Sequence, residues 1–180
     1  MRLASGGAIE CGHVVLATGA RCRELPVPGA EFDGVLPLRT LADADILRER
    51  LAEAREVVVI GAGFIGLEFA AVAIAAGAAV HIIEVTHHPM GRVVSAPTSL
   101  FFTEAHRGWG ATISLGTGVA RILGEGRHVT AVETSGGRVL PADLVLICIG
   151  VVPNCELARD AGLATDNGIV VDEFLATDAP

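Results

Sequence analysis

The clearest pattern in the chain is a strand, a helix and a strand of apolar residues near its middle. Val57–Ile60 is a short, fully apolar run of the kind that is buried in parallel sheets. A nearly all-apolar helix is predicted from about Gly63 to Ala76, and Gly77 is well placed to end it. A second, largely apolar strand, Ala78–Glu84, follows. This order predicts a βαβ unit with parallel strands and a right-handed crossover.

Two further helices flank this unit. Thr40 can cap a helix with helically spaced apolar residues, and Asp43 stands three positions on, as in a capping box. Ser95-Ala-Pro97 opens another helix, which we expect to run to about His106. Together these elements predict an α/β fold with a parallel sheet and flanking helices.

Short β segments follow Ala111 and are separated by glycine-rich turns, which predicts a β-meander. The last segment is the apolar run Leu144–Gly150. A similar pattern occurs near the start, where Ser5-Gly6-Gly7 is followed by Ala8–Ala20, a hairpin arm with an apolar run that ends near Gly19. We expect a hairpin there that feeds a buried strand. The Pro/Gly-rich connector Leu25–Gly34 is a candidate domain crossing.

Composition limits the partners of the chain. Of its 180 residues, 51% are apolar and 19% are charged, which is ordinary for a globular α/β protein. A net charge of −8 argues against nucleic acid as a partner. No apolar run free of Gly and charge reaches the roughly 20 residues that span a bilayer, so we expect no membrane partner and a cytoplasmic location.

Missing residue types exclude several mechanisms. All 13 basic residues are Arg, and the chain has neither Lys nor Tyr. A P-loop, a Schiff-base mechanism and a Tyr–Lys dehydrogenase are therefore excluded. The four cysteines form no C-x-x-C pair, which argues against a redox disulfide motif and a zinc knuckle. We expect reduced thiols and no metal site.

The best candidate for a binding site is the turn between the first strand and the helix of the βαβ unit. Gly61-Ala62-Gly63-Phe64-Ile65-Gly66 is a G-x-G-x-x-G fingerprint that follows an apolar strand and opens a helix. Gly61 permits a tight turn, Gly63 lets the backbone approach a pyrophosphate, and Gly66 allows close packing of helix and strand. The phosphates would lie at the helix N-terminus.

Glu84 closes the second strand, 18 residues beyond Gly66. An acid at this position can accept hydrogen bonds from the adenosine ribose hydroxyls, and it would repel a 2′-phosphate. No Arg follows immediately in Val85–His87 to compensate. The sequence therefore predicts NAD(H) rather than NADP(H) as the cofactor.

Glu68 has two interpretations. It is the only charged residue between Gly63 and Ala76, and it would either favour the first helical turn electrostatically or face the nicotinamide. The adjacent pair His87-His88 cannot share one helix face around a metal, so we expect exposed loop histidines. No residue is assigned a catalytic role.

Several linked motifs together resemble a known family. V-V-V-I-G-A-G-F-I-G-L-E-F-A, preceded by L-A-T-G-A-R and L-P-V-P-G-A, resembles the FAD-dependent pyridine-nucleotide oxidoreductases. Within that family the chain is most similar to the ferredoxin reductases of the putidaredoxin and rhodocoxin reductase type, since L-R-T-L-A-D-A-D, I-G-V-V-P-N and G-L-A-T-D-N-G-I-V-V-D-E also match. The similarity runs nearly from end to end.

The resemblance implies an NADH domain inserted into an FAD domain, with hydride passing from NADH to flavin. Electrons would then pass singly to a small [2Fe-2S] ferredoxin that serves an oxygenase such as a cytochrome P450. The fingerprint glycines carry over to the pyrophosphate loop and Glu84 to the adenosine ribose. Glu68 and Gly150 fall where the family lines the nicotinamide side.

Three departures from the family pattern indicate a fragment. The FAD-binding fingerprint of the family, which lies upstream, and its Gly-Asp strand, which lies downstream, are both absent. Cys22 stands where Pro is usual. We therefore expect residues 1–34 to be a partial FAD-domain strip with a linker, 35–152 an NAD(H)-binding domain, and 153–180 a partial FAD-domain return segment. Related flavin enzymes (disulfide reductases, nitrite reductases, NADH oxidases) and a non-catalytic NAD-binding module remain the alternatives.

Overall fold

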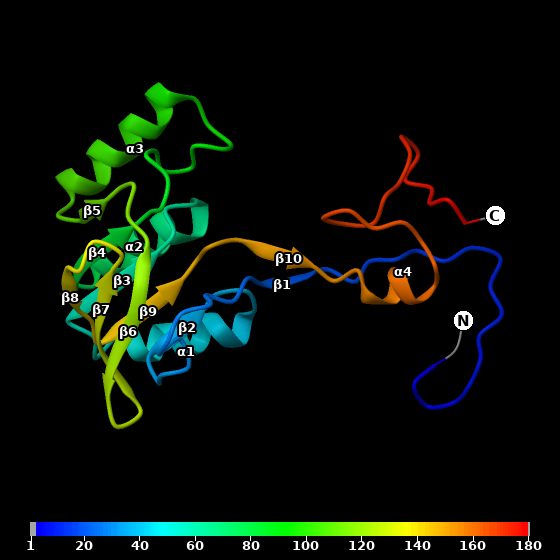
Figure 1. The fold of residues 1–180 in the computed structure, drawn as a ribbon, viewed down its shortest axis with the longest axis horizontal. Helices are drawn as coiled ribbons and strands as arrows, with labels where there is room; N and C mark the ends of the chain where they lie inside the picture. The colour runs from blue at the N-terminus through cyan, green and yellow to red at the C-terminus, as the bar shows by residue number, and fades with distance from the viewer. Residues whose placement is uncertain (1–2, 180) are drawn as a thin grey trace. The chain divides into compact units, whose positions relative to one another are not determined.

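A five-stranded sheet is built around the apolar strands predicted from the sequence. The structure, a computed structural model, describes residues 3–179. The strand order is β2-β9-β3-β4-β5, and all pairings in this sheet are parallel (Figure 1). The strands are β2 (Val35–Pro37), β3 (Glu56–Ile60), β4 (Ala79–Ile83), β5 (Thr112–Ser114) and β9 (Leu144–Ile147). The adjacent, parallel β3 and β4 confirm the predicted βαβ unit.

The predicted helices are confirmed with boundaries close to those expected. They are α1 (Leu41–Leu51), α2 (Phe64–Ala75) and α3 (Ala96–Gly108). Thr40 caps α1 in a complete capping box, because its hydroxyl accepts from the Asp43 N–H while the Asp43 carboxylate accepts from the Thr40 N–H. Gly77, with a φ of 92°, follows the C-cap of α2.

The two faces of the sheet are covered by different layers. Alternate side chains of a strand point to opposite faces, so Val57 and Val59 join a core cluster with α1 and α2. Val58 and Ile60 join a second cluster with the antiparallel meander of β6 (Val119–Glu125), β7 (His128–Thr134) and β8 (Val139–Pro141). The predicted α/β fold with a β-meander is confirmed.

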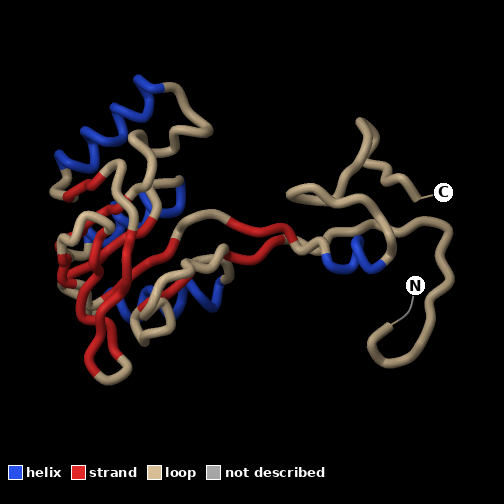
Figure 2. The backbone as a smooth tube through the Cα atoms, viewed as in Figure 1, coloured by secondary structure: helices blue, strands red, loops and turns tan. Residues whose placement is uncertain are grey.

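The chain divides into two compact units. One comprises Cys22–Val151 and contains the sheet, its helices and the meander. The other comprises the residues up to Arg21 and from Val152 onward, and it contains α4 (Glu156–Asp160). The chain passes between the units at β1 (Ala20–Cys22) and β10 (Val151–Pro153), which pair in a two-stranded sheet (Figure 2). The predicted division at 34/35 and 152/153, with its FAD-domain strips, stays a prediction.

The prediction of a hairpin and a buried strand at Ala8–Ala20 is wrong. The structure has no strand from residue 9 to residue 19, and Val14 and Val15 are 54% and 88% exposed. A strand forms only where another strand pairs with it, and no described strand pairs with this stretch. Its likeness to the later segment therefore does not extend to structure, since only the later segment forms β8 and β9.

Candidate dinucleotide-binding site

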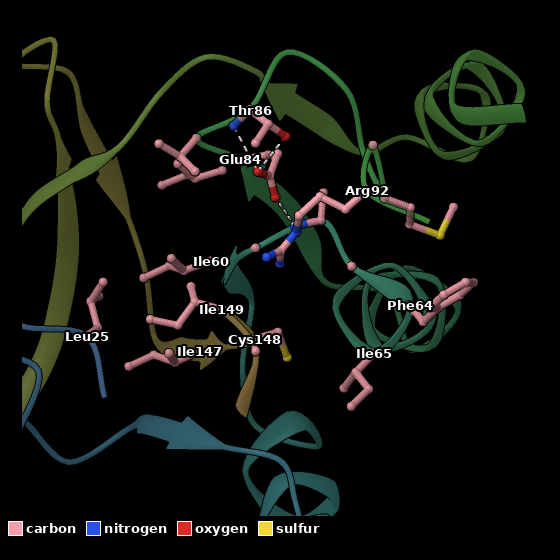
Figure 3. A pocket seen from close by; sticks show the side chains of 18 of the residues that line it. Leu25, Ile60, Phe64, Ile65, Glu84, Thr86, Arg92, Ile147, Cys148 and Ile149 are labelled. Atoms are coloured by element: carbon pink, nitrogen blue, oxygen red, sulfur yellow. Dashed lines mark hydrogen bonds between the residues drawn. The ribbon is translucent and has the colours of Figure 1, made fainter. Parts of the chain in front are cut away.

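A cleft of about 720 Å³ opens in the Cys22–Val151 unit at the carboxyl edge of the parallel sheet (Figure 3). The last residues of three neighbouring strands, Ile60, Ile83 and Ile147, line it together with the segments that follow them. In open α/β sheets, ligands bind outside the carboxyl ends of the strands. The cleft therefore lies where this fold places a ligand.

Each of the three fingerprint glycines lacks a Cβ for a different structural reason. Gly61 has a φ of 103°, and a Cβ there would overlap the carbonyl oxygen of Cys148. A Cβ at Gly66 would overlap the carbonyl oxygen of Gly61, so the first turn of α2 packs directly against the backbone of the glycine turn. A Cβ at Gly63 would meet nothing within 4 Å, which leaves open space for a ligand to approach the backbone.

The N-terminus of α2 faces the cleft without a side-chain cap. Gly63 is the N-cap residue, and no side chain bonds to the first turn. N–H groups at this end of a helix have no intrahelical partners, and the helix dipole places partial positive charge there. Gly63, Phe64 and Ile65 line the cleft, and the Phe64 and Ile65 side chains are exposed. This arrangement suits an anion such as a pyrophosphate.

Glu84 lies directly after β4 and organises the fingerprint turn as well as lining the cleft. Its Oε2 accepts a hydrogen bond from the Ala62 N–H at 2.7 Å. Its Oε1 accepts from both the N–H and the hydroxyl of Thr86, each at 2.8 Å (Figure 3). The sequence predicted only the contact with the ribose, because bonds to Ala62 and Thr86 depend on how the loops fold.

The loop after Glu84 is tied to the same turn. The Met90 N–H donates to the Ala62 carbonyl at 3.0 Å, so Ala62 is held from both sides. Met90 is buried and has a φ of 53°, a left-handed conformation that is rare for a residue with a long side chain. The N–H groups of Val93 and Val94 both donate to the Met90 carbonyl. The resulting tight turn holds the backbone of the intervening Arg92.

Arg92 is a site residue that the sequence did not reveal. It lines the cleft, where it and Glu84 are the only charged residues among the described lining residues (Figure 3). Within residues 3–179, no ion pair or hydrogen bond engages its guanidinium. It lies eight positions beyond Glu84, outside the Val85–His87 segment that directly follows the acid. An unpaired cation in a cleft is a ready partner for a phosphate.

The remaining predicted residues lie in different places. Gly150, with a φ of 99°, lines the cleft. Glu68 does not; it is exposed on α2 and lines a smaller groove with Leu38 and Val72, among others. The interpretation of Glu68 as a first-turn charge is wrong, because α2 begins at Phe64 and its first turn contains no acid. A role for Glu68 towards nicotinamide stays a prediction.

Cys148 lines the cleft, but its thiol is not a nucleophile. Burial, with a smaller contribution from Cys22, raises the pKa of the Cys148 thiol to about 12, so it stays protonated at neutral pH. All four cysteines are free. Within residues 3–179, no group of His, Cys, Asp and Glu side chains is arranged to hold a metal ion, and no helix is long and apolar enough to cross a membrane.

A parallel sheet, a glycine turn before an uncapped helix and an acid after the next strand define a Rossmann-like dinucleotide-binding domain. More specifically, the chain belongs to the pyridine nucleotide-disulphide oxidoreductase family, which matches it over residues 2–180. The family resemblance stated from the sequence is thereby confirmed.

Individual relatives are ferredoxin reductases. The chain is 48% identical to rhodocoxin reductase of Rhodococcus erythropolis, over 98% of this chain and 42% of that protein. It is 43% identical to putidaredoxin reductase CamA of Pseudomonas putida, over 99% of this chain and 43% of that protein. The chain thus spans less than half the length of these relatives.

Solved structures agree with this similarity. The ferredoxin reductase of the CYP199A2 system from Rhodopseudomonas palustris superposes with a TM-score of 0.95 at 50% identity, over 98% of this chain and 44% of that one. The covalent complex of putidaredoxin reductase with putidaredoxin matches with a TM-score of 0.93 at 43% identity, over 99% of this chain and 44% of that one.

Proposed function

We propose that the chain is the NADH-binding part of a flavoprotein ferredoxin reductase. The observation that carries this proposal is the cleft at the uncapped N-terminus of α2, with Glu84 at one side of it. Gly61, Gly63 and Gly66 shape the turn that would receive the pyrophosphate, while Glu84 would accept a ribose hydroxyl. The domain consists of residues 35–152, and Gly150 and Glu68 would lie towards the nicotinamide.

The work of these residues is binding and orientation. NADH supplies the hydride when bound, so the protein must hold the nicotinamide in a fixed place and needs no general acid or base for that task. Accordingly, none of the described residues is assigned a catalytic role.

FAD would be the acceptor of the hydride in the complete enzyme, and we propose that most of its site lies in residues outside this chain. The sequence contains one G-x-G-x-x-G fingerprint, and the cleft described above uses it. Residues 1–34 and 153–180 would contribute strips of the FAD domain.

A small [2Fe-2S] ferredoxin is the proposed electron acceptor of the complete enzyme. The support is the similarity to reductases named for rhodocoxin and putidaredoxin, together with the solved complex of one of them with putidaredoxin. Other flavin-dependent members of the family remain the alternative for the whole protein.

The first test is calorimetric titration of the purified 180-residue chain with NADH and, separately, with NADPH. We expect saturable NADH binding and NADPH binding at least roughly fivefold weaker. The reason is that two like charges about 4 Å apart cost at least about 1 kcal/mol even in water. Glu84 would meet the 2′-phosphate in that way.

Two results would contradict the proposal. Failure to bind either nucleotide would show that the cleft does not function as a binding site in this chain. Equal affinity for both would show that Glu84 does not select the cofactor.

A further inference from the structure

Thr86 makes contacts that give it a role in the selection of the cofactor. Its backbone N–H and its hydroxyl both bond to Oε1 of Glu84, at 2.8 Å each. Thr86 is exposed and lines the same cleft as Glu84. The inference that follows rests on the proposed binding of NADH.

The bonds already made by Glu84 leave little capacity for a ligand. An ionised carboxylate offers about four lone-pair sites, two on each oxygen. The two bonds from Thr86 use those of Oε1, and the Ala62 N–H uses one on Oε2. A single acceptor site therefore remains, and it lies on Oε2. Glu84 can accept one ribose hydroxyl there without losing a bond that it already makes.

The backbone around both residues is held by a neighbouring segment. The Glu84 N–H donates to the Ser114 carbonyl, and the Glu84 carbonyl accepts from the Thr117 N–H, each at 2.9 Å. The Thr86 carbonyl accepts from the Gly116 N–H at 2.9 Å. These three backbone hydrogen bonds hold Glu84 and Thr86 against residues 114–117. The backbone that carries the Thr86 hydroxyl is therefore held in place beside Oε1 of Glu84.

The Thr86 hydroxyl also has a competing acceptor. Its oxygen lies 2.9 Å from the His88 carbonyl and 2.8 Å from Oε1 of Glu84. A hydroxyl carries one proton and can donate to only one of them at a time. A bond to the carboxylate is favoured because hydrogen bonds to charged acceptors are the stronger ones.

We propose that Thr86 is a positioning residue for cofactor selection. By holding Oε1, it keeps the free site of Oε2 available to the ribose and keeps the negative charge where a 2′-phosphate would lie. Removal of the hydroxyl would let the carboxylate turn away, which weakens NADH binding and relieves the repulsion of NADPH.

The test compares Thr86→Val, which removes the hydroxyl and keeps the side-chain shape, with Thr86→Ser, which keeps the hydroxyl. Both variants retain the backbone N–H. Dissociation constants for NADH and NADPH are measured by calorimetry on the full chain. We expect Thr86→Val to weaken NADH by roughly tenfold, as for one lost bond to a charged group. NADPH should change by less than about twofold or bind more tightly, and Thr86→Ser should stay within about twofold of the wild type for both.

A second measurement does not depend on the cofactor. Hydrogen exchange of the Ala62 amide reports whether Oε2 of Glu84 is still held in place. Exchange should be faster in Thr86→Val than in the wild type and unchanged in Thr86→Ser.

The outcomes separate this inference from the proposed function. Equal weakening of NADH and NADPH in Thr86→Val would overturn the inference, since the hydroxyl would then merely shape the loop. Unchanged affinities or unchanged Ala62 exchange would overturn it as well. Failure of the wild-type chain to bind either nucleotide would instead overturn the proposed function, and the role of Thr86 in selection with it.

Discussion

Two opposite charges line the cleft without forming an ion pair. Glu84 is engaged by Ala62 and Thr86, whereas Arg92 has no partner among the described residues. In the proposed function these residues would have separate tasks. Glu84 would discriminate at the ribose, and Arg92 would supply positive charge for phosphate groups that both pyridine nucleotides carry.

Substitution of Arg92 tests this division. We expect Arg92→Gln to weaken NADH and NADPH binding alike, by roughly tenfold, because a charge-assisted bond to phosphate is lost. The loss should be largest at low ionic strength, since salt screens the attraction. Calorimetry at two salt concentrations measures both effects.

Arg107 provides the matched control, because it is exposed in the last turn of α3 and does not line the cleft. Arg107→Gln should leave both affinities unchanged. A selective loss of NADPH binding in Arg92→Gln would contradict a general phosphate contact and would place the guanidinium at the 2′-position.

At the level of elements, α1 is held at its start by a reciprocal cap. Thr40 and Asp43 bond to each other's backbone N–H, and the Asp43 carboxylate also accepts from the Arg39 N–H. The bond from the Thr40 N–H, more than any other contact, holds the pKa of Asp43 below its ordinary value. The ionised carboxylate is therefore the form that the folded state favours.

The contribution of this cap to the free energy of unfolding should depend on pH. A carboxyl whose folded-state pKa is lowered adds stability above its unfolded pKa, and this stability is lost as pH falls through the lower folded value. We expect Asp43→Ala to reduce the free energy of unfolding by about 1 kcal/mol at pH 7. The difference from the wild type should shrink below about pH 4, as measured by denaturant unfolding across pH.

Asp45→Ala is the control on the same helix, since Asp45 makes only an exposed ion pair with Arg48. Its effect should stay below about 0.5 kcal/mol. A destabilisation by Asp43→Ala that is the same at pH 3 and pH 7 would argue against the ionised cap.

On the scale of the whole molecule, buried apolar residues are concentrated in one unit. Both hydrophobic clusters consist of residues between Leu25 and Ile149. The other unit exposes large apolar side chains, with Val15, Phe174 and Leu175 each at least 80% exposed. Such exposure is typical of a surface that another part of a protein covers.

Limited proteolysis should follow this distribution. We expect early cleavage before Cys22 and after Val151, which leaves a resistant product close to that unit. The reason is that segments with few buried contacts open locally at low cost. Mass spectrometry of the products identifies the sites. Early cleavage within the turn between β6 and β7, with both terminal segments intact, would contradict the prediction.

Several features followed from the sequence alone. The apolar run Val57–Ile60, the helix that ends at Gly77 and the acid at Glu84 were recognisable from residue type and spacing. Periodicity and turn chemistry act between near neighbours, so a strand, a helix and their connecting glycine turn are encoded locally. The fold class and the family followed from the same local motifs, taken in order.

Only the tertiary structure revealed the hydrogen bonds from Thr86 to Glu84 and from Met90 to Ala62. It alone also showed that Arg92 lines the cleft. The turn that contains Arg92 begins with the left-handed residue Met90, which no periodic pattern encodes. At Val14 and Val15 the sequence pattern was misleading instead, because it predicted a buried strand that the structure does not form. Whether an apolar run becomes a strand is decided by the presence of a pairing partner, and residue order alone does not specify that partner.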